Sequence, residues 1–116
     1  MGKVTYDEHL HNPPFEYTLS MLEGKWKMRI VFWLHEKAVL RYGELKRLLP
    51  NITHKMLSEQ LKELETNNIV TRTEYKQVPP KVEYSLTEKG LSLFGIVSDM
   101  CAWGHEYRQQ EQETHE

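Results

Sequence analysis

Two alternating runs separated by a pair of prolines constrain the fold of this chain more than any other feature. Polar and apolar residues alternate over 69–76 and again over 81–86, and the residues between them read QVPP. A period of two is typical of β-strands, and a connection of four residues joins antiparallel neighbours. Proline is tolerated at a loop tip but not inside a central strand, because it has no N–H to donate. The pattern therefore predicts a projecting β-hairpin with a stiffened tip.

Two short helical segments precede this hairpin. In residues 43–50 the leucines share one face, and Pro50 ends the helix. In residues 53–68, Thr53 is a good N-cap and leucines recur along one stripe. The leucines of the two faces are Leu45, Leu48, Leu49, Leu57, Leu61 and Leu64. Two such helices joined by a turn of about four residues are typical of a helix-turn-helix motif, although the spacing alone is not specific.

Apolar segments lie on both sides of these elements. Residues 15–24 show helical spacing and end at Gly24, and residues 25–37 are apolar on two sides, as in a central or partner-bound helix. Residues 87–108 begin with Thr87 as an N-cap and have two apolar stripes. These stripes are Leu93, Ile96, Met100, Trp103 and Tyr107, and beside them Phe94, Val97 and Cys101. This face is wider than one small domain needs.

The predicted order of elements is helix, helix, short strand, helix, turn, helix, strand, loop, strand and long helix. That order defines a winged helix-turn-helix, which is mainly α with a small β-hairpin (α+β) and whose hairpin loop is the wing. A chain of 116 residues is long enough for one such domain and marginal for two. We expect a flexible N-terminal arm over 1–13, the winged helix-turn-helix domain over 14–107, and a polar C-terminal tail, frayed, over 108–116.

Composition and charge narrow the possible functions. The chain has 39% hydrophobic and 28% charged residues, a single cysteine, and no apolar run near the ~20 residues of a membrane span. We therefore expect a cytoplasmic protein with no membrane contact. The net charge is -2, but residues 25–89 contain 13 Lys and Arg against 8 Asp and Glu, an excess of 13 - 8 = 5. This uneven distribution of charge suggests that the basic middle part of the chain faces a polyanion. Chance clustering of charges on a solvated surface would look the same.

Double-stranded DNA is the polyanion that these elements fit best. A helix enters the major groove, and side chains on its exposed N-terminal half reach base edges. The expected contacts of the second helix are Thr53, His54, Lys55, Ser58, Glu59 and Lys62. The expected contacts of the wing and of the DNA backbone are Lys76, Gln77, Lys81, Lys25, Arg41 and Lys46. Two alternatives remain open: Glu59 could pair with Lys55 or Lys62 on the helix surface, and the wing lysines could serve solubility alone.

Three motifs resemble a known family. The segments PFEYTLSMLEGKWKMRIVFWL, RYGELKRLLPNITHKMLSEQLKELE and QVPPKVEYSLTEKG occur in order over about residues 14–107. Together they resemble the HxlR-type family of bacterial winged helix-turn-helix transcription regulators. The resemblance implies a cytoplasmic homodimer that binds palindromic operator DNA and is held together by its N- and C-terminal dimerisation helices. The residues expected in that dimer interface are Phe15, Tyr17, Leu19, Leu93, Phe94, Val97, Met100, Cys101 and Trp103.

The resemblance does not extend to the redox chemistry of some family members. Those proteins sense electrophiles or oxidants through a cysteine immediately ahead of the proline that corresponds to Pro14. Pro13 occupies that position here and has no thiol. Cys101 falls in an apolar stripe of the predicted last helix, where a cysteine usually behaves as a small inert hydrophobe. A redox role for Cys101 is the remaining alternative.

The sequence contains no motif of an enzyme, of a cofactor site or of a metal site. It lacks a glycine-rich phosphate loop, an HExxH motif, paired cysteines and a nucleophile elbow. His9 and His11 lie close together near the N-terminus, but a metal site there would need ligands from elsewhere in the chain. We therefore expect neither catalysis nor a bound cofactor or metal.

Two further readings remain. A winged helix can serve protein assembly without binding DNA, which is the rival to a DNA-binding function. Aromatic residues of the terminal helices, at positions 15, 17, 103 and 107, could line a pocket for an effector in a dimer. Aromatics at helical spacing usually pack against each other instead, and the sequence identifies no effector.

Overall fold

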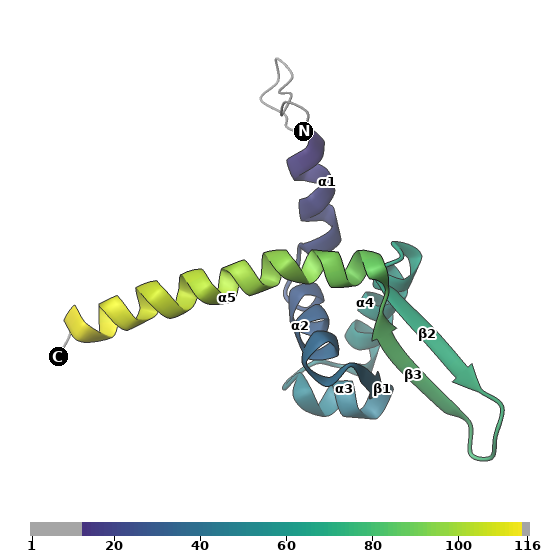
Figure 1. Cartoon of the computed structure of the whole chain (residues 1–116). Coiled ribbons are helices and arrows are strands. Elements are labelled where there is room, and N and C mark those ends of the chain that lie inside the picture. Colours follow the sequence, from purple (N-terminus) through teal and green to yellow (C-terminus); the bar gives the residue numbers. More distant parts are fainter. Residues whose placement is uncertain (1–12, 115–116) are drawn as a thin grey trace.

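Helices and strands follow one another along residues 13–114, which are the residues that the computed structural model describes (Figure 1). Their order is the predicted order, and the fold is mostly helical with a small antiparallel sheet, as the sequence indicates. The elements are α1 (Pro13–Leu22), α2 (Lys27–Lys37), β1 (Val39–Arg41), α3 (Tyr42–Leu48), α4 (His54–Thr66), β2 (Val70–Tyr75), β3 (Lys81–Leu86) and α5 (Glu88–Thr114).

The core forms where α2 passes between the other elements. Ile30 and Val31 of α2 are fully buried, and they share one cluster with Leu45 of α3 and with Leu57 and Leu64 of α4. Side chains on the other side of α2, such as Met28 and Phe32, are half-buried against this cluster. Because each buried leucine or isoleucine stabilises the fold by about 1.5–3 kcal/mol, this cluster fixes how α3 and α4 sit on α2.

The sheet is antiparallel and has the strand order β1-β3-β2. Its inner face contributes the buried Tyr84 to the core, and β2 and β3 project beyond the helices as a hairpin (Figure 1). At the base of the hairpin, Gly90 packs so closely against the backbone oxygen of Ile69 that there is no space for a Cβ. Thr87 is the predicted N-cap of α5, and its Oγ1 accepts a hydrogen bond from the Gly90 N–H at 3.0 Å. The close packing at Gly90 and the cap at Thr87 therefore hold the start of α5 against the base of the hairpin.

Both terminal helices extend away from the body of the domain, which consists of α2, α3, α4 and the sheet (Figure 1). Helix α1 begins two residues earlier than the sequence suggests, at Pro13, since proline is tolerated in the first turn. Helix α5 has 27 residues and is about 40 Å long. It continues through Thr114, whereas a frayed tail was expected from residue 108, because 108–114 are mostly arginine, glutamine and glutamate, which favour helices. Within residues 13–114, no helix is both long and apolar enough to cross a membrane.

Candidate nucleic-acid interface

Helices α3 and α4 form the helix-turn-helix pair. In the turn between them, Asn51 adopts a left-handed conformation with φ 73°, which asparagine tolerates better than most residues, and Ile52 is buried. Thr53 caps α4 as predicted, because its Oγ1 accepts a hydrogen bond from the Met56 N–H at 3.1 Å. The buried stripe of Leu57, Leu61 and Leu64 holds the opposite side of α4 toward solvent. The side chains expected to contact DNA from this helix are all exposed: Thr53, His54, Lys55, Ser58, Glu59 and Lys62.

Tyr42, at the start of α3, contacts the first turns of α4. Its hydroxyl lies 3.2 Å from His54 Nδ1, 3.1 Å from the His54 carbonyl oxygen and 3.2 Å from Ser58 Oγ. The tyrosine and histidine rings are nearly parallel, with centroids 5.8 Å apart. Sequence reasoning did not identify Tyr42, because 12 and 16 residues separate it from its partners and no local period marks such a contact.

The second half of α4 is tied to α2 by an ion pair. Lys27 is buried, and its Nζ lies 3.0 Å from Glu63 Oε2. A charged groove of about 530 Å³ runs beside this pair and is also lined by Glu59 and Lys62. Within residues 13–114, Glu59 forms no ion pair with Lys55 or Lys62, so its carboxylate faces solvent on the exposed side of α4.

The wing comprises the loop 76–80 and the adjoining ends of β2 and β3. Lys76 and Gln77 are exposed at its tip. Lys81 differs from the solvent-directed lysine that the sequence suggests. Its Nζ lies 3.4 Å from Glu83 Oε2 and 4.8 Å from the centroid of the Tyr75 ring, and only 27% of its side chain is exposed. The Glu83 carboxylate also accepts a hydrogen bond from the Tyr75 hydroxyl, which raises the pKa of Tyr75.

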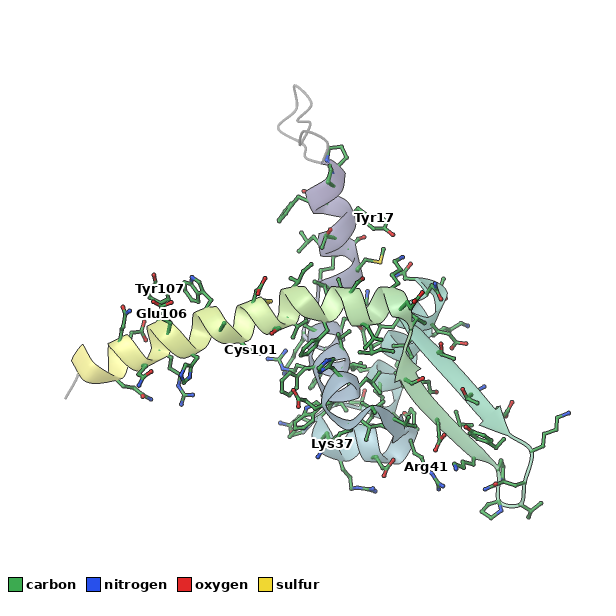
Figure 2. All side chains as sticks on the ribbon, in the orientation of Figure 1. Tyr17, Lys37, Arg41, Cys101, Glu106 and Tyr107 are labelled. Carbon is green, nitrogen blue, oxygen red and sulfur yellow. The ribbon has the colours of Figure 1, made fainter. Side chains whose placement is uncertain are left out.

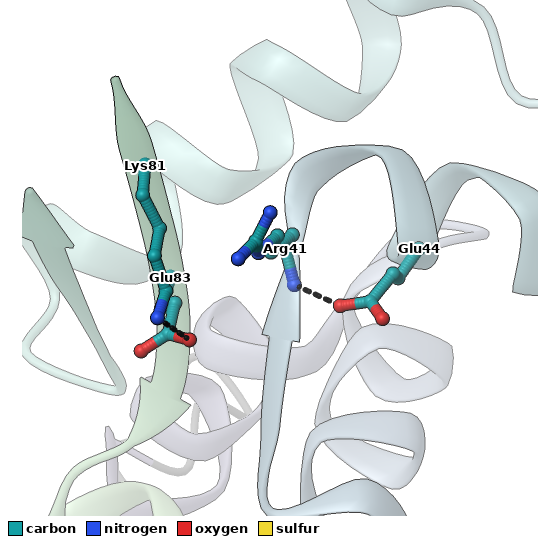
Figure 3. Close-up of polar contacts among 4 residues, drawn as sticks. All are labelled: Arg41, Glu44, Lys81 and Glu83. Carbon is teal, nitrogen blue, oxygen red and sulfur yellow. Dashed lines mark hydrogen bonds and ion pairs between the residues drawn. The ribbon is translucent and has the colours of Figure 1, made fainter. Parts of the chain in front are cut away.

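Arg41 lies beside the wing, on the same side of the sheet as Lys81 and Glu83. The strand register places Arg41 directly opposite Glu83, and the Arg41 N–H donates to Glu44 Oε1 at 2.8 Å at the start of α3 (Figure 3). Lys25 does not join this group. It precedes α2 whereas Arg41 follows it, so about 16 Å of helix separates them. Lys46, on α3, is half-buried.

The residues expected in a dimer interface fall into two groups. Leu93 and Val97 belong to the core of the chain itself, and Phe94 is half-buried, stacked on the His35 ring at 3.5 Å between centroids. The others are exposed along α1 and the distal part of α5. These exposed residues are Phe15, Tyr17, Leu19, Met100, Cys101 and Trp103.

Cys101 is exposed in the single chain, which differs from the packed position that its apolar stripe suggests (Figure 2). The reason is that the distal part of α5 extends beyond the other elements, and among the described residues this part of α5 borders only the edge of α2. There, Cys101 and Met100 line an apolar depression of about 350 Å³ with Phe32 and Trp33. His9 and His11 lie outside the described residues.

An exposed helix attached by a short turn to a second helix, followed by a projecting hairpin, defines a winged helix-turn-helix protein. Residues 21–112 match the family model described as HxlR-like helix-turn-helix. This chain belongs to that family.

Named relatives agree with this assignment. The uncharacterized HTH-type transcriptional regulator YdzF of Bacillus subtilis is 57% identical over 91 residues, which cover 78% of this chain and 84% of YdzF. Among solved structures, the reduced form of the redox regulator HypR is 45% identical, covers 86% of this chain and 98% of its own, and superposes with a TM-score of 0.79. The reduced form of the transcriptional regulator YodB from B. subtilis is 38% identical, with coverages of 84% and 94% and a TM-score of 0.73. The family is thus one of transcriptional regulators rather than enzymes.

Proposed function

We propose that this helix-turn-helix transcriptional regulator acts in the cytoplasm as a homodimer on palindromic operator DNA. In each subunit, the recognition helix, about residues 53–66, enters the major groove, and the wing, about residues 76–81, lies on the flanking backbone. The observation that supports this best is that α4 has a buried leucine stripe, whereas the polar side chains expected to contact DNA, from its N-cap Thr53 to Lys62, are exposed. A major groove about 12 Å wide accepts one such helix.

The exposed side of α4 has the chemistry to distinguish base pairs. Lys55 can donate to the O6 and N7 acceptors of guanine, and Glu59 can accept from the N4 amine of cytosine. Glu59 is available for this role because it forms no ion pair within residues 13–114. Thr53 and His54 lie at the N-terminal end of α4, where backbone amides also favour a phosphate oxygen. Ser58 and Lys62 extend the contact surface along the helix.

The wing and its surroundings would contact phosphates. Lys76 and Gln77 are exposed at the tip of the hairpin, and Arg41 lies beside β3 on the same side of the sheet as Lys81. These groups bind without regard to sequence, because each neutralised phosphate releases condensed counterions. Lys25 and Lys46 extend this contact to more distant parts of the DNA backbone.

The exposed apolar residues of α1 and α5 would pair two copies of the chain. Trp103 is 66% exposed, Phe15 57% and Met100 52%, and large exposed apolar surfaces mark interaction sites. A second copy is the partner that fits, because a two-fold dimer buries the same apolar surface on each subunit. It also presents two recognition helices to half-sites about 34–36 Å apart on DNA.

A winged-helix module for protein assembly is the rival function, and a salt titration separates the two. Fluorescence anisotropy with a duplex would be measured at several salt concentrations. For DNA binding, the logarithm of the association constant falls by about 0.9 per logarithmic unit of salt for each phosphate contact. Changing the exposed Lys55 and Lys62 to alanine should weaken binding at every salt concentration. If the wild-type chain shows no salt-dependent affinity for duplex DNA, the DNA-binding proposal is wrong and the assembly module is favoured.

A further inference from the structure

The hydroxyl of Tyr42 contacts three polar atoms at the exposed start of α4. They are the carbonyl oxygen of His54, Nδ1 of the same histidine, and Oγ of Ser58, all between 3.1 and 3.2 Å away. The hydroxyl has one proton to donate and two lone pairs with which to accept. Three contacts can therefore be satisfied together only if one is donated by Tyr42 and two are accepted.

The chemistry of the three partner atoms decides which hydrogen bond the Tyr42 hydroxyl donates and which two it accepts. A carbonyl oxygen can only accept, so the Tyr42 proton must point to the His54 carbonyl. The tyrosine oxygen then accepts from the Ser58 hydroxyl and from His54 Nδ1, so that Nδ1 has to carry a proton. If Nδ1 were unprotonated, it would take the Tyr42 proton, and two oxygen atoms would face each other at 3.1 Å without a hydrogen between them. A neutral His54 ring that satisfies all three contacts therefore carries its proton on Nδ1 and its lone pair on Nε2.

We propose that Tyr42 is a specificity-determining residue, which fixes the tautomer of His54 so that Nε2 acts as a hydrogen-bond acceptor in the major groove. An acceptor there matches the N6 amine of adenine or the N4 amine of cytosine. It does not match guanine, which presents the acceptors N7 and O6, or thymine, which presents O4 and a methyl group. The rings of Tyr42 and His54 are nearly parallel, and because Nδ1 contacts the Tyr42 hydroxyl, Nε2 is the ring nitrogen that remains for a base. This inference rests on the proposed function, since it names the bases that the recognition helix prefers.

The tautomer can be tested without DNA. Long-range proton–nitrogen correlation spectra of the ¹⁵N-labelled chain distinguish Nδ1–H from Nε2–H in a neutral imidazole ring. The wild type should show Nδ1–H for His54. Tyr42→Phe removes only the hydroxyl and should shift His54 toward Nε2–H, whereas Tyr107→Phe, which removes a hydroxyl from distant α5, should not. A wild-type His54 protonated on Nε2, or an unchanged tautomer in Tyr42→Phe, would overturn the assignment.

The base preference is tested on a bound duplex in which each base pair of one half-site is varied in turn. At one position the wild type should favour adenine or cytosine on the contacted strand by about fivefold or more, the effect of one good base contact. In Tyr42→Phe this preference should fall below about twofold, with other positions unchanged and the fold intact by circular dichroism. A preference that Tyr42→Phe leaves intact refutes the inference even if the protein binds DNA. If no duplex binds at all, the proposed function fails, whereas the tautomer assignment is still decided by the spectra.

Discussion

The contact between Lys81 and Glu83 in the wing predicts that Glu83 weakens DNA binding. The Lys81 ammonium, expected to bind a phosphate, lies 3.4 Å from Glu83 Oε2 in the free chain. A phosphate oxygen at about 2.8 Å from the same ammonium is then within about 6 Å of the Glu83 carboxylate. Two like charges about 6 Å apart repel by about 0.7 kcal/mol in water, which corresponds to about threefold in affinity. Glu83→Gln keeps the shape of the side chain and removes this repulsion.

The variant should therefore bind duplex DNA about threefold more tightly per wing, and about tenfold more tightly when two wings of a dimer are engaged. Fluorescence anisotropy at one fixed salt concentration measures this gain. Glu74→Gln is the matched control, because it removes the same charge from the other side of the hairpin, where Glu74 lies 3.8 Å from Arg72. Binding by Glu83→Gln that is no tighter than that of wild type, or no tighter than that of Glu74→Gln, would refute the reasoning.

Three other variants test different parts of the structure. Lys81→Ala should weaken binding almost equally for all DNA sequences and reduce the salt slope by about 0.9 per chain, and a change in base preference in a duplex competition assay would contradict its role on the backbone. Gly90→Ala should lower the free energy of unfolding by about 1–3 kcal/mol in urea titrations, because its Cβ would meet the backbone of Ile69, whereas Gly95→Ala, with open space around it, should cause no such loss. Cys101→Ser tests a redox role: if oxidant treatment weakens DNA binding of the wild type and of this variant equally, the thiol has no such role, and a loss confined to the wild type would assign it one.

The sequence predicted those parts of the fold that depend on local spacing. The N-caps Thr53 and Thr87 and the leucine stripe of α4 follow from the preferences of short segments, and the structure confirms them. The alternating runs predicted β2 and β3 in the same way. Such patterns report on which side of its own element a residue lies.

Local sequence patterns did not predict the contacts between different helices and strands. The hydroxyl of Tyr42 meets His54 only because the turn brings α3 onto α4, and the ammonium of Lys81 lies over Tyr75 only because the strands pair in one particular register. The exposure of Cys101 depends on where α5 leaves the body. In each case the side-chain type was visible in the sequence, but its partner was decided by tertiary packing.

Selection of duplexes from a pool of random sequence tests the central claim most directly. The purified chain would be incubated with the pool, and the bound DNA would be sequenced over several rounds. A homodimer that places α4 of each subunit in the major groove predicts enrichment of an inverted repeat whose half-sites lie about one helical turn apart, roughly 34–36 Å. Bound DNA without any enriched sequence, or an enriched single half-site bound by one chain, would contradict the account.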